Sequence, residues 1–400
     1  MVRKWLSGVF AVSALLLGSV VMSTPADAAI DTMTVVPSPN ADTGASYLSS
    51  VSCVSTSWCV AVGSTDTDSG TETLIEIWDG SSWTVVDSPV AGGVTDFLRS
   101  VSCVSTEWCV AVGSTFTGSA TETLIVTWDG SSWAVADSPV AGSANDALRS
   151  VSCVSTTWCV AVGNTDTGSA TETLVVSWNG SSWSVADSPN ASTFEDMLRS
   201  VSCVSTSFCI AVGYSIIDGN QTLMLSWDGS DWSVVDSPNP GTPNEVLNGV
   251  SCASSSWCVA VGATPSESGN KPLVEAWDGS SWSVVESPND GNSVLQSVSC
   301  TSETSCVAGG YLAVSFFGTE MLVQTWDGDT WSTLPNPTSG GTGDRIDGAS
   351  CVSGSWCVGV GMKAGGTQTF AVSLTGPEPE PEPTTTTTTP TDEVIPTFAG

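Results

Sequence analysis

The chain of 400 residues carries 41 acidic side chains against 8 basic ones, has no histidine, and bears a formal net charge of −33. A surface of this sign repels nucleic-acid phosphates and anionic lipid headgroups, so we expect neither as a partner. The absence of histidine removes the commonest general base of enzymes, although serine or paired-carboxylate chemistry stays open because Ser and Asp are abundant.

The N-terminal segment has the order of features of an export signal. Arg3 and Lys4 precede an apolar run over 9–21, and Ala26-Asp27-Ala28 offers a small-residue cleavage site. The apolar run is too short for a convincing membrane span. We therefore predict a signal peptide over 1–28 and no integral membrane span in the mature chain. A retained N-terminal anchor is the alternative.

From residue 47 nearly to residue 376 the chain repeats at a step of 48 to 51 residues. The unit at 98–139 is complete, and its alternating pattern predicts four short strands at 98–104, 108–113, 123–128 and 133–137. A repeat of this length, rich in β-branched residues, Trp and Gly turns, is typical of propeller blades or of another repeated sheet.

The two ends of the repeat region complete each other. The last unit predicts strands at 346–352, 356–361 and 369–374, but Pro377 follows where a fourth strand belongs. Residues 32–39 align with 82–89, which hold the fourth strand of the first unit. A ring closed by the N-terminal strand removes the open edges of a linear array. We predict an all-β, seven-bladed propeller of four-stranded blades over 29–376, with an open β-solenoid as the alternative.

The 14 cysteines form seven C-x5-C pairs, one in each unit. In an oxidising compartment this pattern predicts one disulfide within each blade, across the hairpin of its first two strands. Zinc is the competing explanation, but zinc sites favour shorter spacings and a second pair or histidines nearby. The pairs are Cys53/Cys59, Cys103/Cys109, Cys153/Cys159, Cys203/Cys209, Cys252/Cys258, Cys300/Cys306 and Cys351/Cys357.

Six units contain W-[DN]-G-x-x-W between their third and fourth strands. Together with the VSC…WCVAVG stretch and a following S-P, this motif resembles a family of secreted bacterial repeat proteins, and the resemblance covers 33–376. The D-G-x-x-W turn is loosely similar to the Asp-box of sialidase-like propellers and to kelch-like propellers, although the Asp-box separates Asp and Gly by one residue. We interpret the acidic or amide residue as a turn former and both Trp residues as packing between blades. The turn residues are Asp79, Asp129, Asn179, Asp228, Asp278 and Asp327.

Beyond the repeats, 377–400 begins with alternating Pro and Glu and continues with six threonines. Such a composition cannot bury a core, so we predict a disordered stalk or tail. We expect no cofactor. An acidic loop at 66–70, echoed at 166–168, permits a calcium site as a minor alternative, although a complete calcium loop needs more ligands.

One position, just before the innermost strand of each unit, differs between units in contrast to the uniform VSC that follows it. In a propeller this position lies around one mouth of the central channel. We predict a binding site there, formed by Arg99, Arg149, Arg199, Asn248 and Gln296. The complete set across the seven units is Ser49, Arg99, Arg149, Arg199, Asn248, Gln296 and Asp347.

Two readings of the three arginines stay open at this level. They can pair with Asp96, Asp146 and Asp196, three residues earlier in each unit, as weakly stabilising exposed ion pairs. Alternatively, free guanidinium groups can bind a carboxylate or sulfate of a glycan or an acidic peptide over blades 1 to 4.

The sequence therefore predicts a secreted or envelope-associated binding or scaffold module, monomeric, with a glycan or protein as its extracellular partner. No catalytic residues are assigned. The alternatives are an extracellular carbohydrate-active enzyme, either a glycosidase or a lyase, because this fold hosts both kinds of function, and a purely structural surface-layer component.

Overall fold

The computed structural model describes residues 30–41, 44–139, 141, 145–217, 219–238, 243–267, 269–289, 291–315, 318–337, 343–363 and 367–376. The predicted signal peptide and the predicted stalk lie outside these residues. Within the described part every regular element is a β-strand, and no helix there has the length and apolar character needed to cross a membrane.

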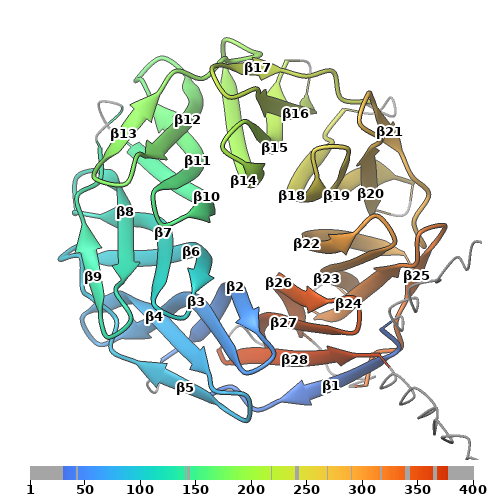
Figure 1. The fold of residues 1–400 in the computed structure, drawn as a ribbon, viewed down its shortest axis with the longest axis horizontal. Helices are drawn as coiled ribbons and strands as arrows, with labels where there is room; N and C mark the ends of the chain where they lie inside the picture. The colour runs from blue at the N-terminus through green and yellow to red at the C-terminus, as the bar shows by residue number, and fades with distance from the viewer. Residues whose placement is uncertain are drawn as a thin grey trace, which may run out of the picture.

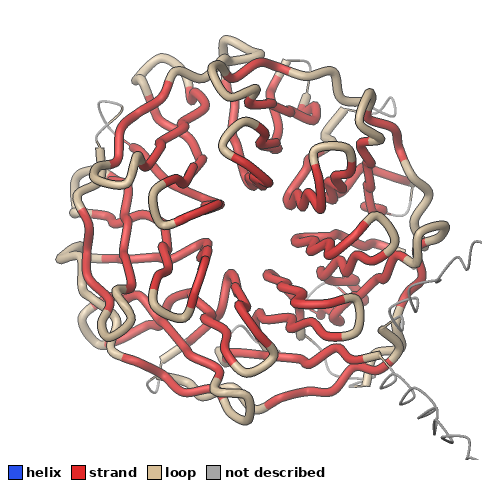
Figure 2. The backbone as a smooth tube through the Cα atoms, in the orientation of Figure 1, coloured by secondary structure: helices blue, strands red, loops and turns tan. Residues whose placement is uncertain are grey.

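The strands form seven four-stranded blades arranged as a ring around a central channel (Figures 1 and 2). In each blade the first strand is innermost. Blade 1 consists of β2 (Ser46–Ser55), β3 (Trp58–Thr67), β4 (Gly70–Trp78) and β5 (Trp83–Val86). Blade 2 consists of β6 (Thr95–Ser105), β7 (Trp108–Phe116), β8 (Thr121–Trp128) and β9 (Trp133–Ala136). Blade 3 consists of β10 (Asn145–Ser155), β11 (Trp158–Asp166), β12 (Thr171–Trp178) and β13 (Trp183–Ala186).

The remaining blades follow the same order. Blade 4 consists of β14 (Glu195–Ser205), β15 (Phe208–Ile216), β16 (Asn220–Trp227) and β17 (Trp232–Val234). Blade 5 consists of β18 (Val246–Ser254), β19 (Trp257–Ser266), β20 (Gly269–Trp277) and β21 (Trp282–Val284). Blade 6 consists of β22 (Asn292–Ser302), β23 (Ser305–Ser315), β24 (Gly318–Trp326) and β25 (Trp331–Thr333). Blade 7 combines β26 (Arg345–Ser353), β27 (Trp356–Met362) and β28 (Thr369–Thr375) with β1 (Thr32–Val36).

The predicted ring closure is confirmed. β1 pairs antiparallel with β28, from Thr32 opposite Thr375 to Val36 opposite Ala371, and the blue and red ends of the chain meet in this blade (Figure 1). Met33 occupies the place that Trp83 has in blade 1 and is buried against Leu374 and neighbouring side chains. The N-terminal strand thus covers an edge that β28 would otherwise expose.

The predicted disulfides are also confirmed, one in each blade. Each joins directly opposite residues of the first two strands; in blade 2 Cys103 faces Cys109 with their Cα atoms 4.1 Å apart. No free cysteine is found among the described residues. Seven disulfides in one chain indicate an oxidising compartment. The bonded pairs are Cys53–Cys59, Cys103–Cys109, Cys153–Cys159, Cys203–Cys209, Cys252–Cys258, Cys300–Cys306 and Cys351–Cys357.

The two cysteines of a pair differ in accessibility. The first lies on the innermost strand and is partly buried, whereas the second lies on a strand that the neighbouring blades cover on both faces. The second cysteine is therefore closed to any ligand, and the pair is a structural cross-link rather than an accessible site. The fully buried members are Cys59, Cys109, Cys159, Cys209, Cys258, Cys306 and Cys357, each at most 2% exposed.

The W-[DN]-G-x-x-W motif forms the turn between the third and fourth strands. In blade 1 the Asp79 Oδ1 atom accepts hydrogen bonds from the amides of Ser81 and Ser82 at 2.8 and 2.9 Å, while Gly80 has a φ of +95° that favours glycine. The Ser81 hydroxyl and the two amides hold the pKa of Asp79 down to about 2. Trp78 donates its indole N–H to the Thr56 carbonyl at 3.0 Å, which fastens this turn to the neighbouring hairpin.

The hydrophobic core lies between blades. One cluster packs Val60, Val62 and Ile75 of blade 1 against Leu98 and Val101 of blade 2, together with further side chains of that blade. Equivalent clusters recur around the ring, including one between blades 7 and 1. Each blade is therefore covered on both faces, which explains why the W-C-V-A-V-G part of the second strands, such as residues 108–113 of β7, carries no charge on either side.

Serine hydroxyls connect the innermost strands of adjacent blades. The Ser52 Oγ atom of blade 1 accepts a hydrogen bond from the Cys103 amide of blade 2 at 3.0 Å, and the pattern repeats at each step. Ser350 of blade 7 completes the circle by accepting from the Cys53 amide at 3.0 Å. The V-S-C motif thus supplies a packing residue, an acceptor for the next blade and a disulfide.

Two glutamates are buried in the third strands of blades 1 and 5. Glu76 of β4 and Glu275 of β20 are inaccessible to solvent, and each accepts one hydrogen bond, from the Ser38 and Ser237 hydroxyls respectively, both at 2.9 Å. Their Oε1 atoms have no hydrogen-bond partner within the described residues. Burial raises the pKa of both carboxyls from 4.5 to about 8, so each keeps its proton at neutral pH.

Deleting residues 30–40 should destabilise the protein by at least about 3 kcal/mol and promote aggregation, because it removes the buried Ile30 and Met33 side chains and exposes β28. A circular permutant supplies the matched control. Joining Gly376 to Asp31, and opening the chain after residue 41, places four residues between Leu374 and Met33, as in the other blades. The permutant should recover the melting temperature. A deletion variant that melts like the intact chain would refute closure by β1.

Changing Glu76 and Glu275 to Gln should flatten the dependence of stability on pH. Below pH 4.5 these carboxyls are neutral in both the folded and the unfolded chain. Between pH 4.5 and about 8 the unfolded chain loses their protons while the folded chain retains them, so stability falls as pH rises, by up to about 1.4 kcal/mol per pH unit for each group.

Urea unfolding at pH 4.5, 6 and 8 measures this effect. The double variant should gain most at pH 8, since an amide does not titrate. Gln324, at the equivalent place in β24, shows that an amide fits there, because it accepts from Ser287 and donates to the Pro288 carbonyl. Glu107→Gln on an exposed turn is the control and should leave the pH profile unchanged. A gain that is equal at all three pH values would contradict buried, protonated glutamates.

Candidate functional site

The varying position of each unit is a β-bulge within the innermost strand. In β6, Leu98 faces Gly113 and Ser100 faces Val112, which leaves Arg99 without an opposite residue. The register of all seven described innermost strands shifts at the same point. We call the unpaired residues the bulge ring: Ser49, Arg99, Arg149, Arg199, Asn248, Gln296 and Asp347.

This placement corrects the expectation that these residues precede the innermost strand. β6 begins at Thr95 rather than at residue 98, because β7 also runs longer than predicted and pairs with it as far as Phe116. The bulge turns side chains out of the regular alternation and directs them into the channel. Gly113 permits it, since a Cβ atom there would overlap the Phe97 carbonyl and lie 3.0 Å from the Leu98 Cα atom.

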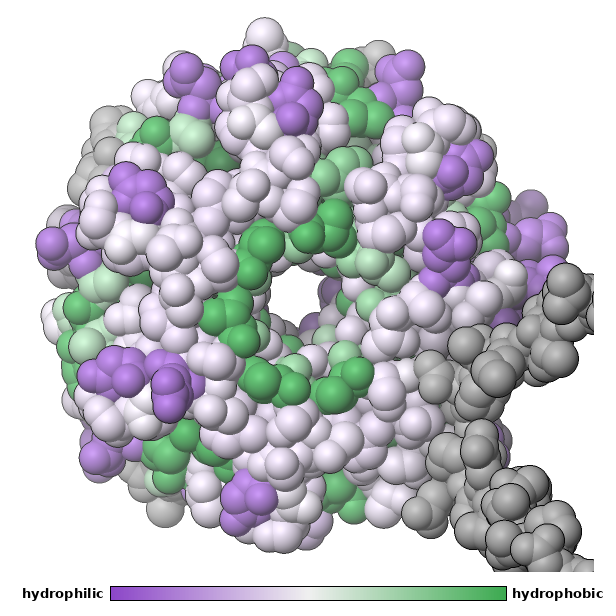
Figure 3. All heavy atoms as spheres, in the orientation of Figure 1, coloured by the Kyte–Doolittle hydropathy of each residue, from purple (hydrophilic) through white to green (hydrophobic). Residues whose placement is uncertain are grey.

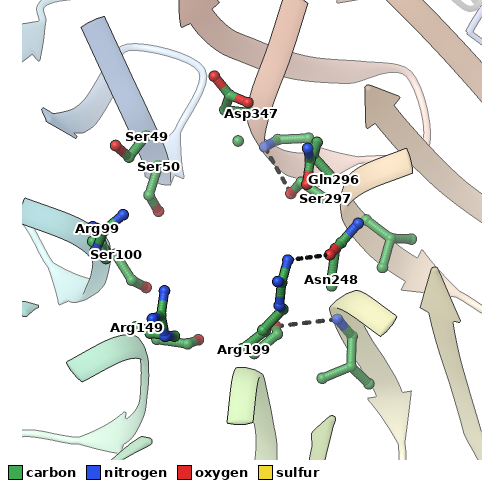
Figure 4. Close-up of a pocket in the computed structure, with 17 residues that line it drawn as sticks. Ser49, Ser50, Arg99, Ser100, Arg149, Arg199, Asn248, Gln296, Ser297 and Asp347 are labelled. Atoms are coloured by element: carbon green, nitrogen blue, oxygen red, sulfur yellow. Dashed lines mark hydrogen bonds between the residues drawn. The ribbon is translucent and has the colours of Figure 1, made fainter. Parts of the chain in front are cut away.

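The bulge ring lines two adjoining cavities of the channel. A cavity of about 270 Å³ is bounded by the ring together with Tyr47 and Arg345, and a deeper one of about 150 Å³ adds a layer of serines that includes Ser100 and Ser150. Figure 4 shows the three arginines on neighbouring blades, with Gln296 and Asp347 across the channel from them. Figure 3 views one face of the molecule and shows the channel open at its centre.

Arg149 lies in the middle of three like charges. Its Nε atom donates to the Asn164 Oδ1 atom at 3.1 Å. Burial, reinforced by repulsion from Arg99 and Arg199, lowers the pKa of Arg149 to about 10. The guanidinium stays charged at neutral pH, so the protein holds a cation in a place that disfavours it.

The two flanking arginines retain unused donors. The Arg199 Nη1 atom donates to the Asn248 Oδ1 atom at 2.8 Å and its guanidinium lies 5.1 Å from the centre of the Tyr214 ring, but its buried Nε atom has no hydrogen-bond partner within the described residues. Arg99 is exposed, and its guanidinium lies 5.6 Å from the centre of the Phe97 ring.

The aspartates three residues earlier do not pair with these arginines. Asp96 accepts from the Thr115 hydroxyl at 2.5 Å and from the Ala91 amide at 3.1 Å. Asp146 makes the corresponding bonds to Thr165 and Ala141, and Asp196 accepts from the Ser192 amide. All three carboxylates are buried in the connections between blades. The alternative reading of the sequence, surface ion pairs between these residues, is therefore wrong.

The opposite side of the cavity is balanced in charge. Arg345 and Asp347 form the one ion pair found among the described residues, with 2.8 Å between Nε and Oδ2. Burial raises the pKa of Asp347 and the neighbouring Arg345 opposes that rise. Arg345 was not among the residues predicted from sequence, because the comparison of units followed a single position. Its signal was available: every arginine after residue 28 lines this one cavity.

The acidic residues where β3 turns into β4 are hydrogen-bonded by hydroxyl groups of the same hairpin. Thr71 donates to the Asp66 Oδ1 atom at 2.9 Å, while Thr67 and Ser69 donate to the Glu72 Oε1 atom at 3.2 and 3.0 Å. Within the described residues no group of three or more His, Cys, Asp and Glu side chains is placed to hold a metal ion.

Comparisons with known proteins bear on the fold. No protein-family model and no curated protein sequence matches the chain. Its structure is similar to that of YCF48 bound to D1 peptide, with a TM-score of 0.54 and 13% identity over 88% of this chain and 99% of that one. It is also similar to YCF48 from Cyanidioschyzon merolae, with a TM-score of 0.52 and 14% identity over 86% and 98% of the two chains. At these identities the similarity concerns the fold alone.

Replacing Arg149 by Gln should leave the free energy of unfolding unchanged or raise it by up to about 1 kcal/mol, because a buried charge flanked by like charges is removed. Arg345→Gln is the comparison and should lower stability slightly, since it leaves the carboxylate of Asp347 without its partner. Chemical denaturation at pH 7 distinguishes the two. A loss of more than about 1 kcal/mol for Arg149→Gln would mean that this arginine is a structural residue.

Proposed function

We propose that the protein is a secreted or cell-surface binding propeller, which holds a partner through an anionic group taken into the arginine-lined side of its central channel. The observation that carries this proposal is the distribution of positive charge. Residues 29–400 contain six basic side chains, and the four arginines among them all line one cavity of a protein with a net charge of −33. Anions are repelled by the acidic surface but attracted to this cavity.

The chemistry of the arginines supports a carboxylate or sulfate as the bound group. Guanidinium groups present planar pairs of donors that match these anions in a bidentate manner. Arg99 is exposed, and Arg199 has a buried donor without a partner within the described residues. Burial and, after it, repulsion from Arg99 and Arg199 lower the pKa of Arg149, and a bound anion would offset both.

The site lies in an open channel, so one group of a partner larger than the cavity can enter it (Figure 3). The predicted signal peptide and the seven disulfides favour a location outside the cytoplasm, where a glycan or another exported protein would be met.

The competing function, hydrolysis or elimination on a carbohydrate, has no specific observation in its favour. Most glycosidases use two carboxylates on either side of the scissile bond. Among the described residues that line the two cavities, Asp347 is the one carboxylate, and it is paired with Arg345.

The test is binding of anionic polymers to the full oxidised chain and to a variant with Arg99, Arg149 and Arg199 changed to Gln. The probes are heparin oligosaccharides, polygalacturonate, poly-glutamate and neutral dextran. At least one anionic probe should bind the unchanged protein, bind the variant at least about tenfold more weakly, and weaken as salt is raised.

A second variant controls for net charge. Lys271 and Lys363 lie outside the cavity, and their change to Gln should leave binding unaltered. Equal affinity of the arginine variant and the unchanged protein, with both melting alike, would reject the channel as the binding site.

A further inference from the structure

Exposed apolar side chains gather at the end of the ring where the innermost strands begin. Thr95 faces Phe116 and Glu195 faces Ile216, so the first residues of innermost strands and the last residues of second strands share this end. Six exposed large hydrophobic residues of the described chain lie there, and five belong to blades 2 and 4 or to the connections that lead into them. We call these five the apolar patch: Val90, Val94, Phe116, Phe194 and Ile217.

The apolar patch lies over the same blades as the three arginines. At blade 2 the Val94 amide donates to the Phe116 carbonyl at 2.7 Å, which holds these two members of the apolar patch next to each other. The Phe194 carbonyl accepts from the Thr171 amide of blade 3 at 3.0 Å, so this side chain, 70% exposed, stands between blades 3 and 4. Contiguous exposed apolar surface with polar residues around it marks interaction sites on soluble proteins.

Along their strands, two aromatic residues stand between members of the apolar patch and the arginines. Phe97 comes two residues after Thr95, the first residue of β6, and its ring lies beneath the Arg99 guanidinium. Tyr214 stands two residues before Ile216 and lies beneath the Arg199 guanidinium, with its hydroxyl bonded to Glu195. Arginine and aromatic side chains are the groups that dominate the energetics of protein interfaces.

From this arrangement, and resting on the proposed function, we infer that the partner is an extended acidic segment of another protein. Its carboxylates occupy the arginine side of the channel, and its apolar side chains pack on the apolar patch over blades 2 to 4. Binding is specific because the acidic surface repels such a segment everywhere except at the arginines. A sulfated or carboxylated glycan would use the arginines but gain little from exposed Val, Ile and Phe side chains.

The experiment selects peptides from a random 12-residue library displayed on phage, with the full oxidised chain as bait. Sequences that combine Asp or Glu with Leu, Ile, Val or Phe should be enriched. As synthetic peptides they should lose at least about tenfold in affinity for the Arg99, Arg149 and Arg199 to Gln variant. Failure to enrich such sequences would overturn the inference.

Paired variants of exposed apolar residues separate a protein partner from a glycan. Changing Phe116 and Phe194 to Ser should weaken the selected peptides at least about fivefold while leaving heparin or polygalacturonate binding unchanged. Changing Val135 and Val185 to Ser, two exposed residues on the outer strands β9 and β13, is the matched control and should change neither. These positions are at the surface, and melting temperatures establish that all variants fold.

The outcomes distinguish this inference from the proposed function. Anion binding that depends on the arginines but not on Phe116 and Phe194 would leave the channel site in place and overturn the acidic polypeptide in favour of a glycan. Binding of peptides and polymers that is indifferent to the arginines, or absent altogether, would overturn both.

Discussion

The ring depends on hydrogen bonds between the innermost strands of adjacent blades. An innermost strand has a free edge toward the channel, and its amides need acceptors. The serine before each blade's first cysteine supplies one to the next blade, and Ser350 does the same for Cys53 across the junction of the two chain ends. Because the circle is complete, the arrangement sets the spacing of all seven blades at once.

The same constraint explains why most channel positions are uniform and one is not. A second layer of serines, such as Ser50 accepting from the Val101 amide, continues the contacts, and it is interrupted where Gly249 and Gly348 stand. The bulge residue lies between the second layer of serines and the start of the innermost strand, and no residue of the second strand pairs with it. It is therefore free to vary, and the near-identical blades obtain an asymmetric site from that single position. The three arginines lie on consecutive blades. Across the channel from them stand Gln296, which is uncharged, and Asp347, whose carboxylate is paired with Arg345.

Much of the architecture follows from the sequence because it depends on local spacing. The C-x5-C pairs place two cysteines opposite each other in a hairpin, and the displaced fourth strand at 32–36 implies closure.

The hydrogen bonds of Asp96 could not be predicted from the sequence, because they depend on the β-bulge. Counting back from Cys103 opposite Cys109 in an unbroken ladder places Asp96 opposite Phe116, whereas the bulge moves it opposite Thr115, its actual hydrogen-bond partner. The recurring glycine that ends each WCVAVG stretch is the signal for the bulge. Contacts across blades, such as Ser38 with Glu76, depend on the curvature of the ring and leave no local pattern.

The most direct test of an anion site in the channel is to locate an anion there. Crystals of the full oxidised chain, soaked in selenate, allow the anion to be placed by the anomalous scattering of selenium. The account predicts a selenate within hydrogen-bonding distance of at least two of Arg99, Arg149 and Arg199, which is lost when these residues are changed to Gln. Selenate bound elsewhere while the channel stays empty, or arginines found paired with carboxylates of the chain, would contradict it.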